Sequence, residues 1–273
     1  MPARRFLAAA TSGFLFAACP AQAIAATFST EYSVRLVGIP IGTAGVEAKF
    51  RDGRYTIAFS GRVGGLARLF SHASASAAAA GETGSDRLSP SEYRHQWTED
   101  DETERARVRF RNADVIEISL ERPVRHKEQD VPVTEAHKRN VLDPASAFLW
   151  PASAGAAPET CERTLKLFNG RHRFDLAFRY SRTDSFQASD GSYSGPAVVC
   201  AMRYTPLSGY RRSKASVRFM AENRDMEVWM APTGDGFVAP VKIRVRTKYG
   251  RLVLEARRFA GSGGDRAIPA QPG

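Results

Sequence analysis

The most regular feature of the chain is an alternation of apolar and polar residues with a period of two, which is typical of β-strands with one buried face. Its first clear instance places Phe28, Tyr32 and Leu36 on one side and Glu31 and Arg35 on the other. Further strands are predicted over residues 46–50, 55–59, 73–83, 92–99, 104–111, 114–121, 162–168, 171–180, 196–205, 214–222, 225–231, 239–248 and 251–259.

Turn residues separate these strands at characteristic places. Asp52-Gly53 and Asn169-Gly170 each stand between two alternating runs and predict tight hairpins. Helical signals are scarce, and residues 63–70 indicate a turn or a short helix. The better helix is predicted over residues 143–150, where Asp143 can cap the free amides, Pro144 suits the first helical position and Pro151 ends the helix.

These elements predict an all-β, mainly antiparallel fold: one large, strongly curved sheet or open β-barrel with about 12 strands and one short helix. The domain organisation that we expect is one β domain over residues 27–259. Residues 124–141 are polar and irregular and predict a loop that crosses to the helix. Residues 260–273 are rich in Gly, Pro and Ala and predict a disordered tail.

The first 26 residues have the order of an export signal. Arg4 and Arg5 precede an apolar run, and small residues around Ala23 and Ala25 offer a cleavage site. The run is too short for a permanent membrane span, and no transmembrane span is expected after cleavage. We therefore expect an exported, periplasmic protein. A twin-arginine signal and lipid anchoring through Cys19 are weaker alternatives, because the residues around both motifs match imperfectly.

Cleavage would leave two cysteines, Cys161 and Cys200, which in an oxidising compartment predict one disulfide. Two separately buried thiols are the alternative. Cys161 precedes one predicted strand, and Cys200 lies in the second strand after it. In a flat sheet these two strands would flank a common neighbour and lie about 10 Å apart. A disulfide therefore requires either that Cys161 lie in coil folded over the sheet or that the sheet curve sharply.

The net charge limits the classes of partner that the protein is expected to bind. The net charge of +10 falls to +8 without residues 1–26, which hold Arg4 and Arg5 and no acidic residue. A basic protein favours anionic partners, and the expected compartment points to envelope components such as phospholipid headgroups and away from nucleic acid. A basic surface that only keeps the protein soluble is the alternative.

Two strands carry cations at alternate positions, which places each set on one sheet face. Rows of like charge repel unless carboxylates or a bound anion neutralise them. Glutamates at 102, 104, 117 and 255 could supply that pairing. These cations therefore form either a candidate anion-binding face or a solvated face whose charges are paired within the sheet. The residues concerned are Arg105, Arg107, Arg109 and Arg111 in the first ladder and Lys242, Arg244, Arg246 and Lys248 in the second.

The apolar faces carry many aromatic residues. A curled sheet with an apolar interior can hold an acyl chain or similar ligand, but the same side chains can also fill a closed core. The residues concerned are Phe28, Tyr32, Phe50, Tyr55, Phe59, Phe110, Phe174, Phe178, Phe219, Trp229 and Phe259.

The sequence contains little that indicates catalysis. Its five histidines (His72, His95, His126, His137 and His172) have no metal-binding spacing. Neither a nucleophile elbow nor a phosphate-binding loop is present. Asp143, Ser146 and His137 form a conceivable catalytic set, but capping and packing explain the first two. We therefore expect no enzyme, catalytic residue, metal or cofactor.

Several phrases, in this order, resemble a known family. They are Gly38-Ile-Pro-Ile-Gly42-Thr-Ala, Val141-Leu-Asp-Pro-Ala-Ser-Ala147, Leu167-Phe-Asn-Gly-Arg-His-Arg-Phe-Asp175 after Cys161, Gly195-Pro-Ala-Val-Val-Cys200 and Arg224-Asp-Met-Glu-Val-Trp-Met-Ala-Pro232. Over residues 28–259 the chain resembles the exported bacterial proteins of domain-of-unknown-function family 3108. Asn169 replaces an aspartate of the family's hairpin turn and keeps the turn chemistry. The resemblance implies an envelope location and a β-rich fold; the family has no established activity, so no catalytic residues carry over from it.

Two hypotheses about function follow. The first is a non-enzymatic periplasmic cell-envelope protein that binds a lipid-like or apolar ligand in its curved scaffold. The second is a ligand-free structural or interaction protein that contacts anionic envelope components through the basic strand faces.

Overall fold

A computed structural model of the chain describes residues 26–69, 72–99, 102–121, 131–152, 155–234 and 236–261. Within these residues, fourteen strands form one antiparallel sheet. They are β1 (Ala26–Leu36), β2 (Ile39–Arg51), β3 (Arg54–Val63), β4 (Ser74–Thr83), β5 (Leu88–Glu99), β6 (Glu102–Arg111), β7 (Asp114–Leu120), β8 (Trp150–Pro151), β9 (Arg163–Phe168), β10 (Arg173–Gln187), β11 (Ser194–Ser208), β12 (Met226–Pro232), β13 (Phe237–Thr247) and β14 (Gly250–Gly261).

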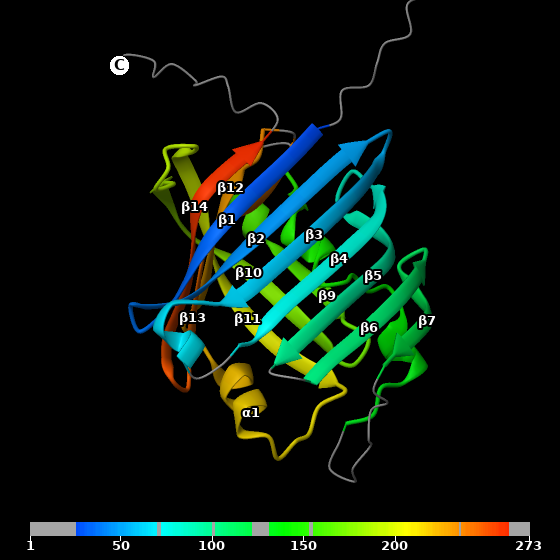
Figure 1. Cartoon of the computed structure of the whole chain (residues 1–273). Helices are drawn as coiled ribbons and strands as arrows, with labels where there is room; N and C mark the ends of the chain where they lie inside the picture. Colours follow the sequence, from blue (N-terminus) through cyan, green and yellow to red (C-terminus); the bar gives the residue numbers. More distant parts are fainter. Residues whose placement is uncertain are drawn as a thin grey trace, which may run out of the picture.

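The sheet consists of two antiparallel meanders that meet at the first and last strands. Its order is β7-β6-β5-β4-β3-β2-β1-β14-β13-β12-β11-β10-β9, and β8 pairs with β13. Thr30 of β1 lies opposite Phe259 of β14. The meander from β1 to β7 lies across the strands β9 to β12, so that the sheet curls over a shared interior without closing (Figure 1). The predicted curved all-β fold is confirmed, with 14 strands instead of about 12.

The alternation in the sequence decides which side chains fill this interior. In β1, Phe28, Thr30 and Tyr32 are at most 2% exposed, whereas Glu31 between them is exposed. The main core joins such residues from both meanders, and Leu149 of the connecting segment packs among them. Most of the predicted aromatic residues therefore fill a packed core and do not line an open barrel.

A second, smaller core surrounds the disulfide. Cys161 and Cys200 are bonded with their Cα atoms 5.3 Å apart, and both are fully buried. Cys161 ends a 3-10 turn, η4 (Pro158–Cys161), which lies over β10 and β11. Of the two geometries that the sequence allowed, a short coil folded over the sheet therefore brings the cysteines together. Trp150 packs in the same cluster, and its ring meets Phe178 at 4.7 Å.

The helices differ from the prediction. Residues 214–222, predicted as a strand, form the α-helix α1 (Ala215–Glu222), because in so short a segment the apolar residues fit either period. The predicted helix over 143–150 is reduced to the 3-10 turn η3 (Ser146–Phe148), because Trp150 and Pro151 pair with β13 as β8. The other 3-10 turns are η1 (Gly65–Leu69) and η2 (Glu135–Lys138).

The opening between the edge strands β7 and β9 is bridged by residues 140–142. The backbone of Leu142 donates to Lys166 and accepts from Phe168 of β9, while Val141 donates to Ala113 in the β6–β7 turn. The β9–β10 turn also reaches the first meander, because Arg171 forms an ion pair with Glu104 of β6 at 2.7 Å. The two edges are therefore held together by a loop and a turn and not by strand pairing.

Three sequence predictions lie outside the described residues. They are the export segment up to residue 25 with Cys19, most of the expected tail (residues 262–273), and residues 124–130 of the expected crossing loop with His126. They stay predictions. Of the helices in the described residues, none is long and apolar enough to cross a membrane.

Candidate functional site

A pocket of about 400 Å³ lies between the inner faces of β3, β4 and β5 and the segment that precedes η3. Small residues create it: Gly61 pairs with Ala75, and Ala75 pairs with Trp97. The pocket exists because β4 supplies side chains too short to fill the space that its neighbours enclose. Pro144 and Ala145 close the side facing the core.

Large apolar side chains bound this space. Phe59 and Tyr93 line it together with Trp97, which is 47% exposed and so stands where the pocket meets solvent. A lining of this kind, in a volume of a few hundred Å³, is typical of sites for small apolar ligands.

His95 is one of the titratable groups that line the pocket. Its Nδ1 is buried and has no hydrogen-bond partner among the described residues. Burial lowers the pKa of His95, and Arg171 lowers it further while Glu104 raises it. The ring is therefore neutral at pH 7 and can offer one polar contact to a ligand in a mainly apolar lining.

A buried polar cluster lies behind the pocket. Asp143 is fully buried, and its Oδ1 accepts hydrogen bonds of 2.9 Å from the backbone N–H groups of Ala145 and Ser146. The sequence predicted that Asp143 would cap a helix, and its carboxylate does bind these amides, but at the start of a 3-10 turn. Asp143 Oδ2 has no hydrogen-bond partner in the described part of the chain. Burial raises the pKa of Asp143 to about 6, against the hydrogen bonds that lower it.

Two tyrosines of the sheet adjoin this carboxyl group. The hydroxyls of Tyr55 and Ser146 lie 2.6 Å apart. Burial raises the pKa of both Tyr55 and Tyr93, and the charge of Asp143 raises it further. Since Tyr93 also lines the pocket, the cluster connects the pocket wall with the core segment.

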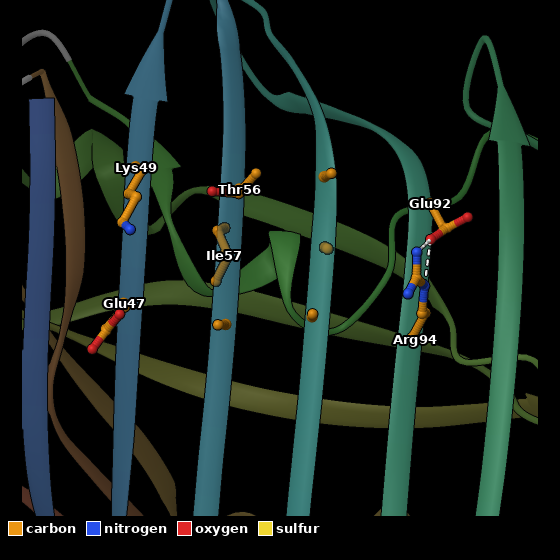
Figure 2. Close-up of a pocket in the computed structure, with 10 residues that line it drawn as sticks. Glu47, Lys49, Thr56, Ile57, Glu92 and Arg94 are labelled. Atoms are coloured by element: carbon orange, nitrogen blue, oxygen red, sulfur yellow. Dashed lines mark hydrogen bonds and ion pairs between the residues drawn. The ribbon is translucent and has the colours of Figure 1, made fainter. Parts of the chain in front are cut away.

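The opposite face of the same strands carries a shallow hollow of about 310 Å³ (Figure 2). Thr56 and short alanines form its floor, with Lys49 on one side and Glu92 and Arg94 on the other. A neighbouring hollow of about 650 Å³ extends across the strands to Arg107. Both lie on the outer surface, where charged side chains already pair with one another.

The first predicted ladder projects outward as expected and faces carboxylates. Arg105, Arg107 and Arg109 contact Glu121, Glu92 and Glu117 at 2.9, 2.5 and 2.8 Å, respectively. Although partial burial alone would raise it, hydrogen bonds from Arg107 and Arg94 hold the pKa of Glu92 below its usual value. For Arg111 the described residues provide no carboxylate at ion-pair distance.

The second ladder is paired only in part. Lys242 contacts Glu255 at 2.7 Å, and Arg244 contacts Glu227 at 2.6 Å. Both cations also lie 5.5 Å from the ring of Trp229. For Arg246 and Lys248, nearer the β13–β14 turn, no carboxylate among the described residues lies at ion-pair distance.

The conceivable catalytic set is not assembled. His137 Nδ1 bonds to the backbone and hydroxyl of Thr134 at 3.1 Å, and no hydrogen bond joins His137 to Ser146 or Asp143. Within the described ranges, no three His, Cys, Asp or Glu side chains gather as metal ligands.

Sequence reasoning missed the pocket itself. It treated His95 as one unremarkable histidine and did not single out Trp97. The available signal was the run of small residues from Ser74 to Gly81 on a strand, since a buried strand face without bulk leaves space beside its neighbours.

Comparison with known proteins gives a family and a distant structural likeness. The model of the family described as "Protein of unknown function (DUF3108)" matches residues 31–257. A beta-barrel-like protein of domain of unknown function DUF1849 from Brucella abortus shares 10% sequence identity, with a TM-score of 0.47, over 86% of this chain and 97% of its own. No curated protein matches significantly.

Proposed function

The chain belongs to the DUF3108 family, and from that premise we propose that it is a non-enzymatic cell-envelope protein that binds a small apolar or lipid-like ligand in the pocket beneath β3, β4 and β5. The observation that carries the proposal is the pocket lining: mainly apolar side chains surround about 400 Å³, and His95 Nδ1, which is buried and has no hydrogen-bond partner among the described residues, offers a polar contact. Since the aromatic core is packed, the ligand would occupy this pocket and not the whole curved interior.

An exported, periplasmic location is part of the proposal. The order of charge, apolar run and small residues in residues 1–26 supports it. The buried Cys161–Cys200 disulfide adds independent support, because structural disulfides persist mainly in oxidising compartments.

Ala75 allows a direct test. Its methyl group faces the pocket, whereas Ala78 on the same strand is exposed on the opposite face. Ala75→Leu should fill part of the pocket and weaken the binding of an environment-sensitive apolar dye by about tenfold, as expected for a blocked apolar site. Ala78→Leu adds the same bulk to the same strand and should leave dye binding unchanged.

The test has clear contrary outcomes. Wild-type protein that binds no dye and shows no added mass by native mass spectrometry would contradict the proposal. Equal loss of dye binding in both variants would also contradict it, since the effect would then come from the strand and not from the pocket. Protein melting curves for both variants establish that they are folded.

The second hypothesis, a ligand-free protein that contacts anionic envelope components through both ladders, has weaker support. Arg105, Arg107, Arg109, Lys242 and Arg244 already contact carboxylates. A new anionic partner would have to displace these pairs, so the paired ladders are better explained as a solvated surface.

A further inference from the structure

The three large apolar side chains with the highest exposed fractions among the described residues lie at one end of the sheet. Among the described residues, Tyr249, Val37 and Ile39 are the most exposed large hydrophobics, at 70, 63 and 58%. Val37 lies in the β1–β2 turn, Ile39 is the first residue of β2, and Tyr249 lies in the β13–β14 turn. We call these three residues the apolar tip.

The two turns lie side by side. The backbone N–H of Val37 donates a 2.8 Å hydrogen bond to the carbonyl of Arg251. A Cβ on Gly250 would approach the Val37 side chain to 2.4 Å, so the two hairpin ends are in close contact. The two hairpin ends therefore place Val37 and Ile39 at the same end of the sheet as Tyr249, although about two hundred residues separate them from it in the sequence.

Cations surround the patch. Arg35, Arg246, Lys248 and Arg251 are exposed beside the two turns. Lys248 Nζ lies 4.7 Å from the centre of the Tyr249 ring. Among the described residues, the carboxylate at ion-pair distance from these four cations is that of Asp225, which lies 3.6 Å from Arg251. An exposed apolar patch with a basic rim fits a layer that is negatively charged at its surface and apolar beneath.

The backbone of Val37 gives an independent indication. Both residues of the β1–β2 turn have positive φ, 50° for Val37 and 81° for Gly38, a conformation that β-branched residues strongly disfavour. The β2–β3 turn of the same chain meets the same need with Asp52 and Gly53, at 51° and 72°. Val37 thus places an apolar side chain at an exposed turn position whose backbone conformation favours a residue such as Asp52.

We propose that the apolar tip and its basic rim form a membrane-docking surface that inserts Val37, Ile39 and Tyr249 among the lipids of an anionic bilayer. This surface is separate from the pocket, and the inference does not depend on a ligand there. It does have a geometric relation to the pocket: Gly61, Ala75 and Trp97 lie toward the same end of the sheet as the two turns, because β1, β3 and β5 end there and β2 and β4 begin there.

Vesicle co-sedimentation of the protein as recovered from cells tests the proposal. Wild-type protein should bind vesicles of phosphatidylglycerol and phosphatidylcholine in equal parts, and bind pure phosphatidylcholine vesicles much less. Val37→Ser, Ile39→Ser and Tyr249→Ser combined should lower binding to the anionic vesicles at least about tenfold. Ile116→Ser, which removes an apolar side chain that is 47% exposed on β7, is the matched control and should not change binding.

A charge variant separates the contribution of the basic rim from that of the apolar side chains. Arg35→Gln, Arg246→Gln and Lys248→Gln combined should weaken binding to anionic vesicles and remove most of its salt dependence. Inorganic phosphate at millimolar concentration should not compete, because a bilayer surface and not a phosphate ion is the partner. Competition by inorganic phosphate would overturn the proposal in favour of a small anion site.

Val37→Asn distinguishes function from structure, because Asn tolerates the left-handed conformation of the turn. It should raise the melting temperature and at the same time reduce vesicle binding. The proposal is overturned if wild-type protein binds neither kind of vesicle, or if the triple serine variant and Ile116→Ser bind alike. It is also overturned if ultracentrifugation shows that the tip mediates self-association and not vesicle binding.

Discussion

The hydroxyl oxygens of Tyr55 on β3 and Ser146 in η3 lie 2.6 Å apart, and both residues are buried. This contact ties the sheet to the segment that crosses its interior. Ser146 also donates its backbone N–H to Asp143, so that one short turn holds a tyrosine, a serine and a carboxyl group in the core. Buried polar networks of this kind stabilise a fold only when their members are satisfied.

Removal of the tyrosine hydroxyl should therefore be costly. Tyr55→Phe leaves the Ser146 hydroxyl without its partner, and we expect the free energy of unfolding to fall by about 1–3 kcal/mol. Ser146→Ala alone should cost a similar amount, and the double variant should cost less than the sum of the two. Urea denaturation measures all three; strictly additive losses would show that the two hydroxyls do not interact.

The buried carboxyl of Asp143 should make stability depend on pH. Because its folded pKa, about 6, lies above the ordinary 3.8, the folded state holds the proton more tightly than the unfolded state does. This contribution is fully present below pH 3.8 and is lost as the pH rises through 6. Wild-type protein should thus lose up to about 3 kcal/mol relative to Asp143→Asn over this range.

Denaturation curves of both proteins from pH 3.5 to pH 8 check this expectation. The difference between the two proteins is the relevant quantity, since His95 and His172, whose pKa values are lowered chiefly by burial, titrate in both. A difference that stays constant across the range would show that the pKa of Asp143 does not change on folding.

Loss of the disulfide should destabilise the protein without changing its strand content. Cys161 and Cys200 are 39 residues apart, a loop for which chain entropy gives about 4 kcal/mol. Cys161→Ala with Cys200→Ala should lower the urea midpoint accordingly. Because both cysteines are fully buried, reductant should act on the native protein only as fast as it unfolds. Free thiols in unreduced protein would contradict the bond.

Gly170 should be more sensitive to substitution than a glycine with similar backbone and more space. It has φ of 95°, and a Cβ there would lie 3.1 Å from Val108 of β6. Gly191, with φ of 78°, has no atom near such a Cβ. We expect Gly191→Ala to cost about 1 kcal/mol from the backbone alone. Gly170→Ala should cost about 1–3 kcal/mol more, because the added methyl group forces the contact with β6 apart.

Urea denaturation of the two alanine variants separates conformation from packing at this turn. Equal losses would mean that the contact between the β9–β10 turn and β6 contributes nothing to stability.

The sequence predicted the local strands well because each obeys a simple rule. Alternation identified β1 through residues such as Phe28 and Tyr32, and Asp52-Gly53 located a hairpin. It failed at α1, where Val217 and Met220 fit a helix but the neighbouring alternation fits a strand. At α1, the secondary structure depends on how the segment connects β11 to β12, and the short-range pattern of apolar residues does not determine it.

The candidate site was harder to predict because no distinctive side chain marks it. Arginine positions such as Arg107 stand out in a sequence, yet the structure pairs that residue with Glu92. The pocket depends instead on Ala75 and Gly61 facing one another across two strands, beside Trp97. Such a space appears only when register and curvature are known, and neither follows from composition.

The pairing of β1 with β14 has a consequence for how the fold forms. The hydroxyl of Thr30 bonds to the carbonyl of Arg258 across 228 residues of sequence, so this contact requires almost the entire chain. Each meander can assemble from neighbouring hairpins, but the two half-sheets keep unpaired edges until the last strand arrives. Joining them closes the longest loop in the molecule, which makes it the natural slow step of folding. A chain that ends before β14 would expose the edge of β1 to aggregation.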